Sequence, residues 1–215
     1  MGKKGWCLLV ALALCVAVGA PLAVFGWMDA AVLGRDTPIS TQTGKLAVSS
    51  SDLPLVEHIH NALGETNAQE QSSRPATLEE MESGLSDFLS SGVLPQWVAD
   101  VWKQVCQTGA DTVTVTYGTD IISYEYNGTD GVSCSYTTDL ASGCVLGFQL
   151  YTKEEHTTSQ ERRQAVMERY IQYLGLDVLG DWVYNGNRYQ STEAQLFVNA
   201  LLEEDSGGFS IGVEL

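Results

Sequence analysis

The sequence predicts an α+β protein: an N-terminal transmembrane helix, then one antiparallel sheet of about six to seven strands with helices packed on one face. Three observations predict this fold. A long uncharged segment lies near the N-terminus, a block of stretches alternates apolar and polar residues, and amphipathic stretches of helical period flank that block. Helices that are segregated from strands in this way are typical of α+β layers.

The uncharged segment is WCLLVALALCVAVGAPLAVFGW, residues 6–27, and it follows Lys3 and Lys4. A helix of this length spans about 33 Å, and the hydrocarbon core of a bilayer is about 30 Å thick. Tryptophan stands at both ends, where indole rings favour the membrane interfaces. The lysines predict a cytoplasmic N-terminus, so we expect a single-pass signal-anchor in the cell membrane with the C-terminal domain outside.

Two other kinds of N-terminal segment, a cleaved signal peptide and a lipoprotein leader, are disfavoured. A cleaved signal peptide needs small residues at the cut, and residues 18–20 supply them, but Pro21 follows immediately and obstructs the peptidase. A lipoprotein leader needs a small residue before its cysteine, and Leu14 precedes Cys15. Cleavage would instead give a secreted domain.

The segment after the leader is strongly acidic. All 27 Asp and Glu residues lie after residue 28, together with nine of the 11 Lys and Arg residues, which leaves a formal charge of −18. Such a surface repels nucleic acid phosphates and anionic lipid headgroups. We therefore expect no nucleic acid partner. The charge favours solubility, and it also attracts cations and basic peptides.

Three regions are predicted. Residues 1–29 form the cytoplasmic stub and the membrane anchor. Residues 30–75 form a polar tether with a possible short helix at 53–64. Residues 76–215 form one extracytoplasmic α+β domain, which is long enough to bury its own core.

This domain begins with two predicted helices. Thr77 and Glu80 have the spacing of a capping box, and apolar residues follow at helical spacing until Gly92. A second helix starts at Pro95 and ends at Gly109. Each helix is apolar on one side only, so each needs a flat surface to cover.

Strands follow. Four alternating stretches predict a meander, with the turn cluster NGTDG at 127–131 between its second and third strands. Residues 158–175 return to a helical period, and Asn185-Gly186 predicts a hairpin turn. The stretch 192–204 fits a helix or a strand, and we favour a strand because 209–213 alternates behind it.

Four tyrosines and two cysteines are candidate functional residues. Tyr117, Tyr124, Tyr126 and Tyr136 lie in phase with the meander valines, so they are either core residues, which we favour, or a ligand-facing aromatic surface. Cys134 and Cys144 flank a predicted turn near residue 139. They form either a disulfide or two reduced thiols that pack as small apolar side chains.

No catalytic, cofactor-binding or metal-binding residue is predicted. His58 and His60 are two residues apart, so on a helix their side chains diverge and do not share a metal ion. Paired acids occur mainly at helix starts and turns, where acids are favourable or solvated. Glycine-rich phosphate loops and nucleophile motifs are absent from the sequence.

We therefore expect a non-enzymatic recognition or accessory module at a cell envelope, of bacterial type, with an envelope protein or glycan as its partner. The alternative is an envelope hydrolase or glycan-processing enzyme that uses acidic residues.

The anchor is tested by measuring the intact mass of the protein recovered from membranes. We expect the mass of the full chain, because Pro21 obstructs cleavage after residue 20. A mature chain that begins after residue 30 would contradict the anchor.

Overall fold

The computed structural model describes residues 49–64, 72–108, 112–128, 131–153, 160–203 and 207–215, all within the compact unit Pro38–Leu215. The predicted membrane segment 6–27 lies outside the described residues. No helix within the described ranges combines the length and apolar composition that crossing a membrane requires.

The described part contains helices and nine strands. The helices are η1 (Ser50–Asp52), α2 (Pro54–Leu63), α3 (Leu78–Ser90), α4 (Gln96–Thr108), α5 (Gln160–Tyr173) and η3 (Leu176–Val178). The strands are β1 (Ser72–Ala76), β2 (Val113–Tyr117), β3 (Ile121–Asn127), β4 (Ser133–Asp139), β5 (Val145–Tyr151), β6 (Val183–Tyr184), β7 (Arg188–Ser191), β8 (Leu196–Glu203) and β9 (Gly208–Glu214).

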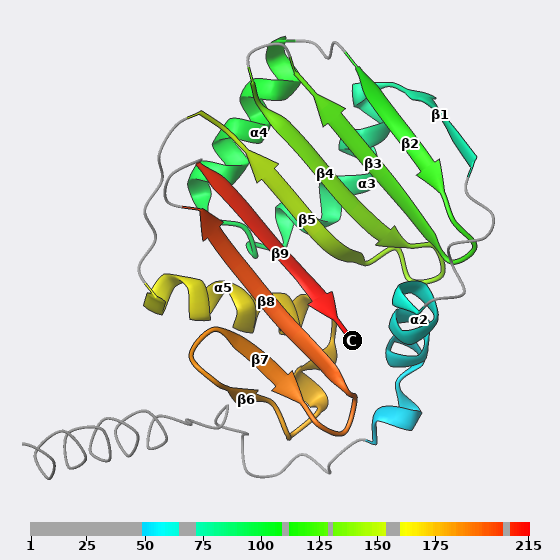
Figure 1. The fold of residues 1–215 in the computed structure, drawn as a ribbon, viewed down its shortest axis with the longest axis vertical. Helices are drawn as coiled ribbons and strands as arrows, with labels where there is room; N and C mark the ends of the chain where they lie inside the picture. Colours follow the sequence, from blue (N-terminus) through cyan, green and yellow to red (C-terminus); the bar gives the residue numbers. More distant parts are fainter. Residues whose placement is uncertain (1–48, 65–71, 109–111, 129–130, 154–159, 204–206) are drawn as a thin grey trace, which may run out of the picture. The chain divides into compact units, whose positions relative to one another are not determined.

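All nine strands form one antiparallel sheet in the order β1-β2-β3-β4-β5-β9-β8-β7-β6 (Figure 1). The first five strands run across the sheet in sequence. The chain then crosses by α5 to the far edge, and the last four strands return inward until β9 pairs with β5. The sheet is thus two meanders joined at the β5–β9 pair.

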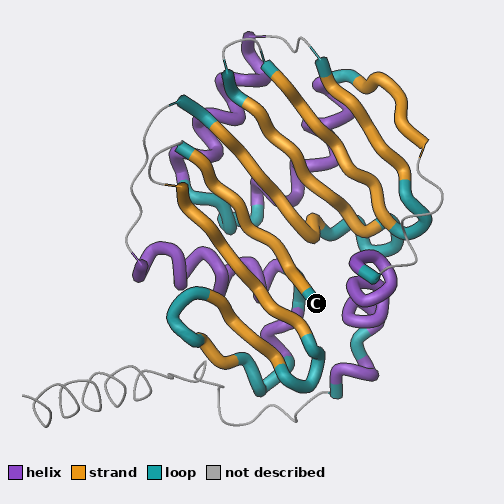
Figure 2. Tube along the Cα trace, in the orientation of Figure 1, coloured by secondary structure: helices purple, strands orange, loops and turns teal. Residues whose placement is uncertain are grey.

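Helices α3, α4 and α5 cover one face of this sheet, and the other face is uncovered toward the viewer (Figures 1 and 2). Aromatic rings connect the two layers: the ring centroids of Phe88 and Phe148 are 5.8 Å apart. The hydroxyl of Tyr170 donates to the carbonyl oxygen of Val145 at 2.9 Å. In the central strands β4, β5 and β9, alternation therefore separates a buried apolar face from a polar open face.

Helix α2 lies beside the end of the sheet that carries the C-terminus (Figure 2). It buries Val56, Ile59 and Ala62 in the common core. The Nε2 atom of His60 lies 2.8 Å from the carbonyl oxygen of Ala194, which fixes the helix to the turn before β8.

Several predictions from the sequence are confirmed. The fold is one antiparallel sheet with helices, and its first long meander is β2 to β5. The capping box of Thr77 and Glu80 is formed in both directions. The ambiguous stretch 192–204 contains strand β8, because Leu196, Val198 and Ala200 alternate into the core.

The predicted number of six to seven strands is wrong. The sequence SSRPA forms the edge strand β1 although it has no apolar pattern, because its backbone pairs with β2 and its side chains stay largely exposed. Strand β6 has only two residues, too few for a periodic signal. The predicted domain start, residue 76, falls at the last residue of β1.

One packing contact gives a direct test. Inside α3, a methyl group at Gly84 would collide with the hydroxyl of Tyr136, which donates to the carbonyl oxygen of Met81 at 2.7 Å. Gly84→Ala should lower the free energy of unfolding by about 1–2 kcal/mol because of this collision. In a Tyr136→Phe background the same change should instead stabilise by up to about 1 kcal/mol, through helix propensity. Urea unfolding measures both, and equal effects in the two backgrounds would refute the contact.

Candidate functional site

The four candidate tyrosines lie on the helix-covered side of the sheet. Tyr126 and Tyr136 are buried, and the ring of Tyr136 stacks on Tyr124 with centroids 5.1 Å apart. The hydroxyl of Tyr117 accepts from Arg74 Nη2 at 2.9 Å near the sheet edge. Burial raises the pKa of the Tyr124 and Tyr136 phenols, so both stay neutral. Tyr126 and Tyr136 are therefore core residues and Tyr124 packs against the core, whereas Tyr117 is half-buried at the sheet edge and is not part of the core cluster.

The possible disulfide between Cys134 and Cys144 is not formed, and both thiols are free. The β4–β5 hairpin is centred further along the chain than predicted, so Cys134 lies opposite Leu150. Cys144 lies in the turn, before the first residue of β5. Register therefore separates the two residues, and Cys134 packs as a small apolar side chain.

The open face of the sheet contains a groove of about 500 Å³. Its floor crosses β4, β5, β9 and β8, and Leu63 of α2 and Ile121 of β3 lie at its margin. The polar side chains that line it come from the open face: Ser135, Thr137, Gln149, Asn199, Ser210 and Glu214. Leu201, which is 51% exposed, adds an apolar wall.

Two glycines form the centre of this floor. Gly147 of β5 pairs directly with Gly212 of β9, and Thr137 and Asn199 flank them on the neighbouring strands. Neither glycine has positive φ. A Cβ at Gly147 would meet nothing within 4 Å, and one at Gly212 would make only ordinary contacts, the nearest at 3.5 Å.

The fold therefore does not require glycine at either position. Glycine inside a strand costs roughly 0.5–1 kcal/mol relative to alanine, and it often marks a place where a ligand or another backbone comes close. The bare strip over Gly147 and Gly212 is the feature of the open face that packing does not explain.

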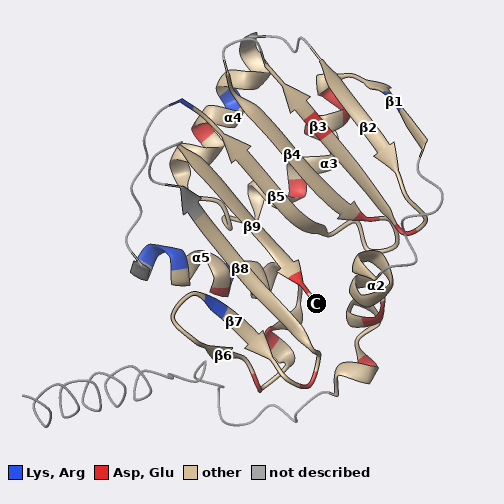
Figure 3. Ribbon diagram, in the orientation of Figure 1, with Lys and Arg blue, Asp and Glu red and all other residues tan. Residues whose placement is uncertain are grey.

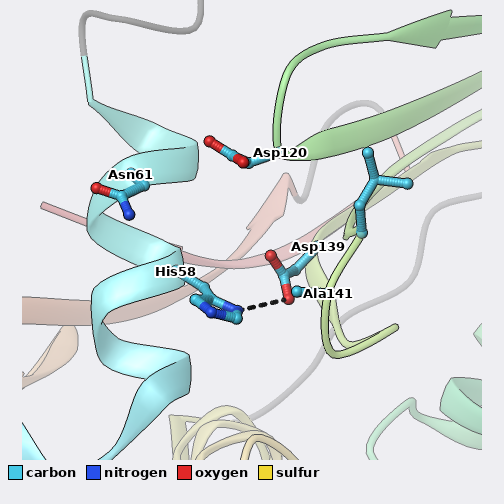
Figure 4. A pocket seen from close by; sticks show the side chains of 6 residues that line it. His58, Asn61, Asp120, Asp139 and Ala141 are labelled. Atoms are coloured by element: carbon cyan, nitrogen blue, oxygen red, sulfur yellow. Dashed lines mark ion pairs between the residues drawn. The ribbon is translucent and has the colours of Figure 1, made fainter.

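A second, smaller hollow of about 220 Å³ adjoins α2. His58 and Asn61 come from α2, Asp120 from the β2–β3 turn, and Asp139, Leu140 and Ala141 from the end of β4 and the turn after it (Figure 4). We call this hollow the acidic pocket. Figure 3 shows acidic segments, and no Lys or Arg of the described chain, at this end of the sheet.

Asp139 lies at the bottom of the acidic pocket, with 1% of its surface exposed. Its Oδ2 accepts from the backbone N–H of Ser142 at 2.6 Å and lies 3.5 Å from Nδ1 of His58, at ion-pair distance without hydrogen-bond geometry. Its Oδ1 has no hydrogen-bond partner among the described residues. This oxygen points toward Asp120 and Asn61 (Figure 4).

His58 and His60 diverge, as their spacing predicts: one faces Asp139 and the other the carbonyl oxygen of Ala194. Within the part of the chain that the structure describes, no group of three His, Cys, Asp or Glu side chains is placed to hold a metal ion.

Sequence reasoning missed both surfaces. Gly147 and Gly212 do not lie in a predicted turn. The only signal in the sequence is that each is a glycine inside a predicted strand, which can indicate a bulge or a close approach of another backbone. Asp120 and Asp139 lie 19 positions apart, and only the β3–β4 pairing brings their turns beside α2.

Comparison with known proteins gives no relative: no family model, curated protein or solved structure matches this chain.

The cysteines give a prediction that depends on pH. Burial, with the carboxylate of Glu82 adding to it, raises the pKa of the Cys106 thiol to about 11, and burial raises that of Cys134 further. Only the thiolate reacts, so alkylation of Cys106 by iodoacetamide should be slow at pH 8 and rise about tenfold per pH unit below that pKa. Cys134 should react only after unfolding. Peptide mapping measures this, and a linked Cys134–Cys144 peptide would contradict the free thiols.

Proposed function

We propose that this protein is a membrane-anchored, extracytoplasmic recognition module, without enzymatic activity, whose open-face groove binds an extended segment of an envelope protein. The observation that carries the proposal is the paired glycines Gly147 and Gly212, which keep the floor bare although the backbone tolerates a side chain there. A bare floor lets a partner backbone come close to the sheet.

The lining suits a peptide. Hydroxyl and amide groups from Thr137, Gln149 and Asn199 offer both donors and acceptors to the polar groups of an extended chain. Leu63 and Leu201, which are 37% and 51% exposed, supply apolar contacts at the margins. Such a mixture of apolar anchors and placed polar groups is typical of binding clefts.

A glycan is the other partner expected from the sequence. It would use the same hydroxyl and amide groups. Sugar binding usually adds an aromatic platform. The two aromatic residues along the groove among the described residues, Tyr136 and Phe148, turn their rings to the helical side: the Tyr136 hydroxyl donates to the carbonyl oxygen of Met81, and the Phe148 ring packs against Phe88. The proposal therefore favours a protein partner.

The enzymatic alternative has one supporting observation, the pairing of His58 with Asp139 beside Asp120. A hydrolase would use these groups as acid and base. This alternative would be established if the protein released soluble fragments from purified cell-wall material and if the Asp139→Asn variant did not.

The groove is tested in the full-length protein in intact cells. A photo-crosslinking residue in place of the exposed Gln149 should capture a protein neighbour, and the same residue in place of Ser90, on the helical layer, should not. Gly147→Val should then reduce capture at least tenfold, because the new side chain fills the empty space above the floor.

The matched control is Thr114→Val, on the open side of β2 and outside the groove. It should leave capture unchanged. Gly147→Val should not lower the melting temperature, because valine favours a strand. Capture that persists in Gly147→Val would refute the groove, and the absence of any protein neighbour at Gln149 would refute the protein partner.

A further inference from the structure

The acidic pocket contains a buried carboxylate, Asp139, and one of its two oxygens has no partner among the described residues. The turn after β4 needs one acceptor from Asp139, and its Oδ2 supplies it to the N–H of Ser142. An asparagine would supply the same acceptor through its amide oxygen. The negative charge and the second oxygen, Oδ1, are therefore not explained by the turn.

That second oxygen is costly where it lies. Asp139 is 1% exposed, and Oδ1 has no hydrogen-bond partner among the described residues. A buried carboxylate is normally paired or fully hydrogen-bonded, because removal from water strongly disfavours an isolated charge. His58 lies on the Oδ2 side, at 3.5 Å, and leaves Oδ1 facing the hollow.

The rest of the pocket favours a cationic ligand. Asp120 supplies a second carboxylate and Asn61 an amide, and both lie on the side to which Oδ1 points (Figure 4). None of the described residues that line the hollow is a Lys or an Arg. Its volume, about 220 Å³, exceeds that of a bare ion and accommodates the end of a basic side chain.

The acidic pocket also adjoins the groove. Asn61 and Leu63 belong to the last turn of α2, and the first lines the pocket while the second lines the groove. Likewise Asp120 lines the pocket and the next residue, Ile121, lines the groove. A segment lying in the groove can thus place one of its side chains in the pocket.

We propose that the acidic pocket binds the guanidinium or ammonium group of an arginine or lysine side chain, with Asp139 Oδ1 and Asp120 as its anionic partners. This inference rests on the proposed function. It adds that the peptide segment bound in the groove carries a basic residue at the end that lies near α2. Bidentate contact with carboxylates makes arginine the better fit of the two.

The test uses N-acetyl-arginine methylamide and the full-length chain in nanodiscs, labelled at alanine and leucine methyl groups. The methyls of Leu140 and Ala141 line the pocket and report on it directly. We expect saturable shifts of these signals with the arginine probe, and at least tenfold weaker binding of the neutral citrulline analogue, which has nearly the same shape.

Two variants should each weaken the arginine probe at least tenfold. Asp139→Asn keeps an oxygen that accepts from the N–H of Ser142. Asp120→Asn changes a half-buried residue in a different turn. If one variant fails to fold, the other still tests the pocket. Asp177→Asn removes an equal charge from an exposed residue outside the pocket and should change nothing.

Three results would overturn the inference. The first is equal binding of the arginine probe and its citrulline analogue, and the second is the absence of any shift with the arginine probe. The third is that calcium alone causes the same shifts and that the arginine probe does not compete with calcium. Gly147→Val should leave the arginine probe unaffected. If Gly147→Val abolishes crosslinking but the arginine probe does not bind, the inference about the acidic pocket is refuted and the proposed function stands. If the arginine probe binds but Gly147→Val leaves crosslinking unchanged, the proposed function is refuted and the pocket stands.

Discussion

The pairing of β5 with β9 is the interaction on which the rest of the domain depends. It joins a meander built from residues before α5 to one built from residues after it, and it places residues 147–151 against residues 208–212. Separated, each half would expose an apolar edge and lose the continuous surface that α3, α4 and α5 cover. Because this pairing joins distant parts of the chain, its loop-closure cost makes it the expected slow step of folding.

The same pairing creates the groove. In its register Gly147 lies opposite Gly212, so two neighbouring positions at the centre of the open face have no side chain. A one-residue slip of β9 against β5 would turn β9 over and bring Ile211 to the open side. The buried apolar face therefore fixes the geometry of the polar one, and the core holds the groove in place.

Helix α2 connects the two surfaces. Its apolar side enters the common core, and its other residues border both the acidic pocket and the groove. Two histidines of the helix contact other elements: His60 lies against the turn before β8, and His58 lies beside Asp139. A partner that fills the acidic pocket would thus contact α2 and the sheet at the same time.

The sequence by itself determined the class of fold, most of the helices and strands, the capping box at Thr77 and the burial of Tyr126 and Tyr136, because periodicity and turn chemistry act over a few residues. It did not predict β1, whose polar sequence forms a strand only because β2 is beside it. The Cys134–Cys144 pairing depended on a hairpin register that local patterns do not fix. The glycine floor and the pairing of Asp139 with His58 were decided only by the tertiary structure, because each joins residues from strands, turns or helices that are far apart in the chain.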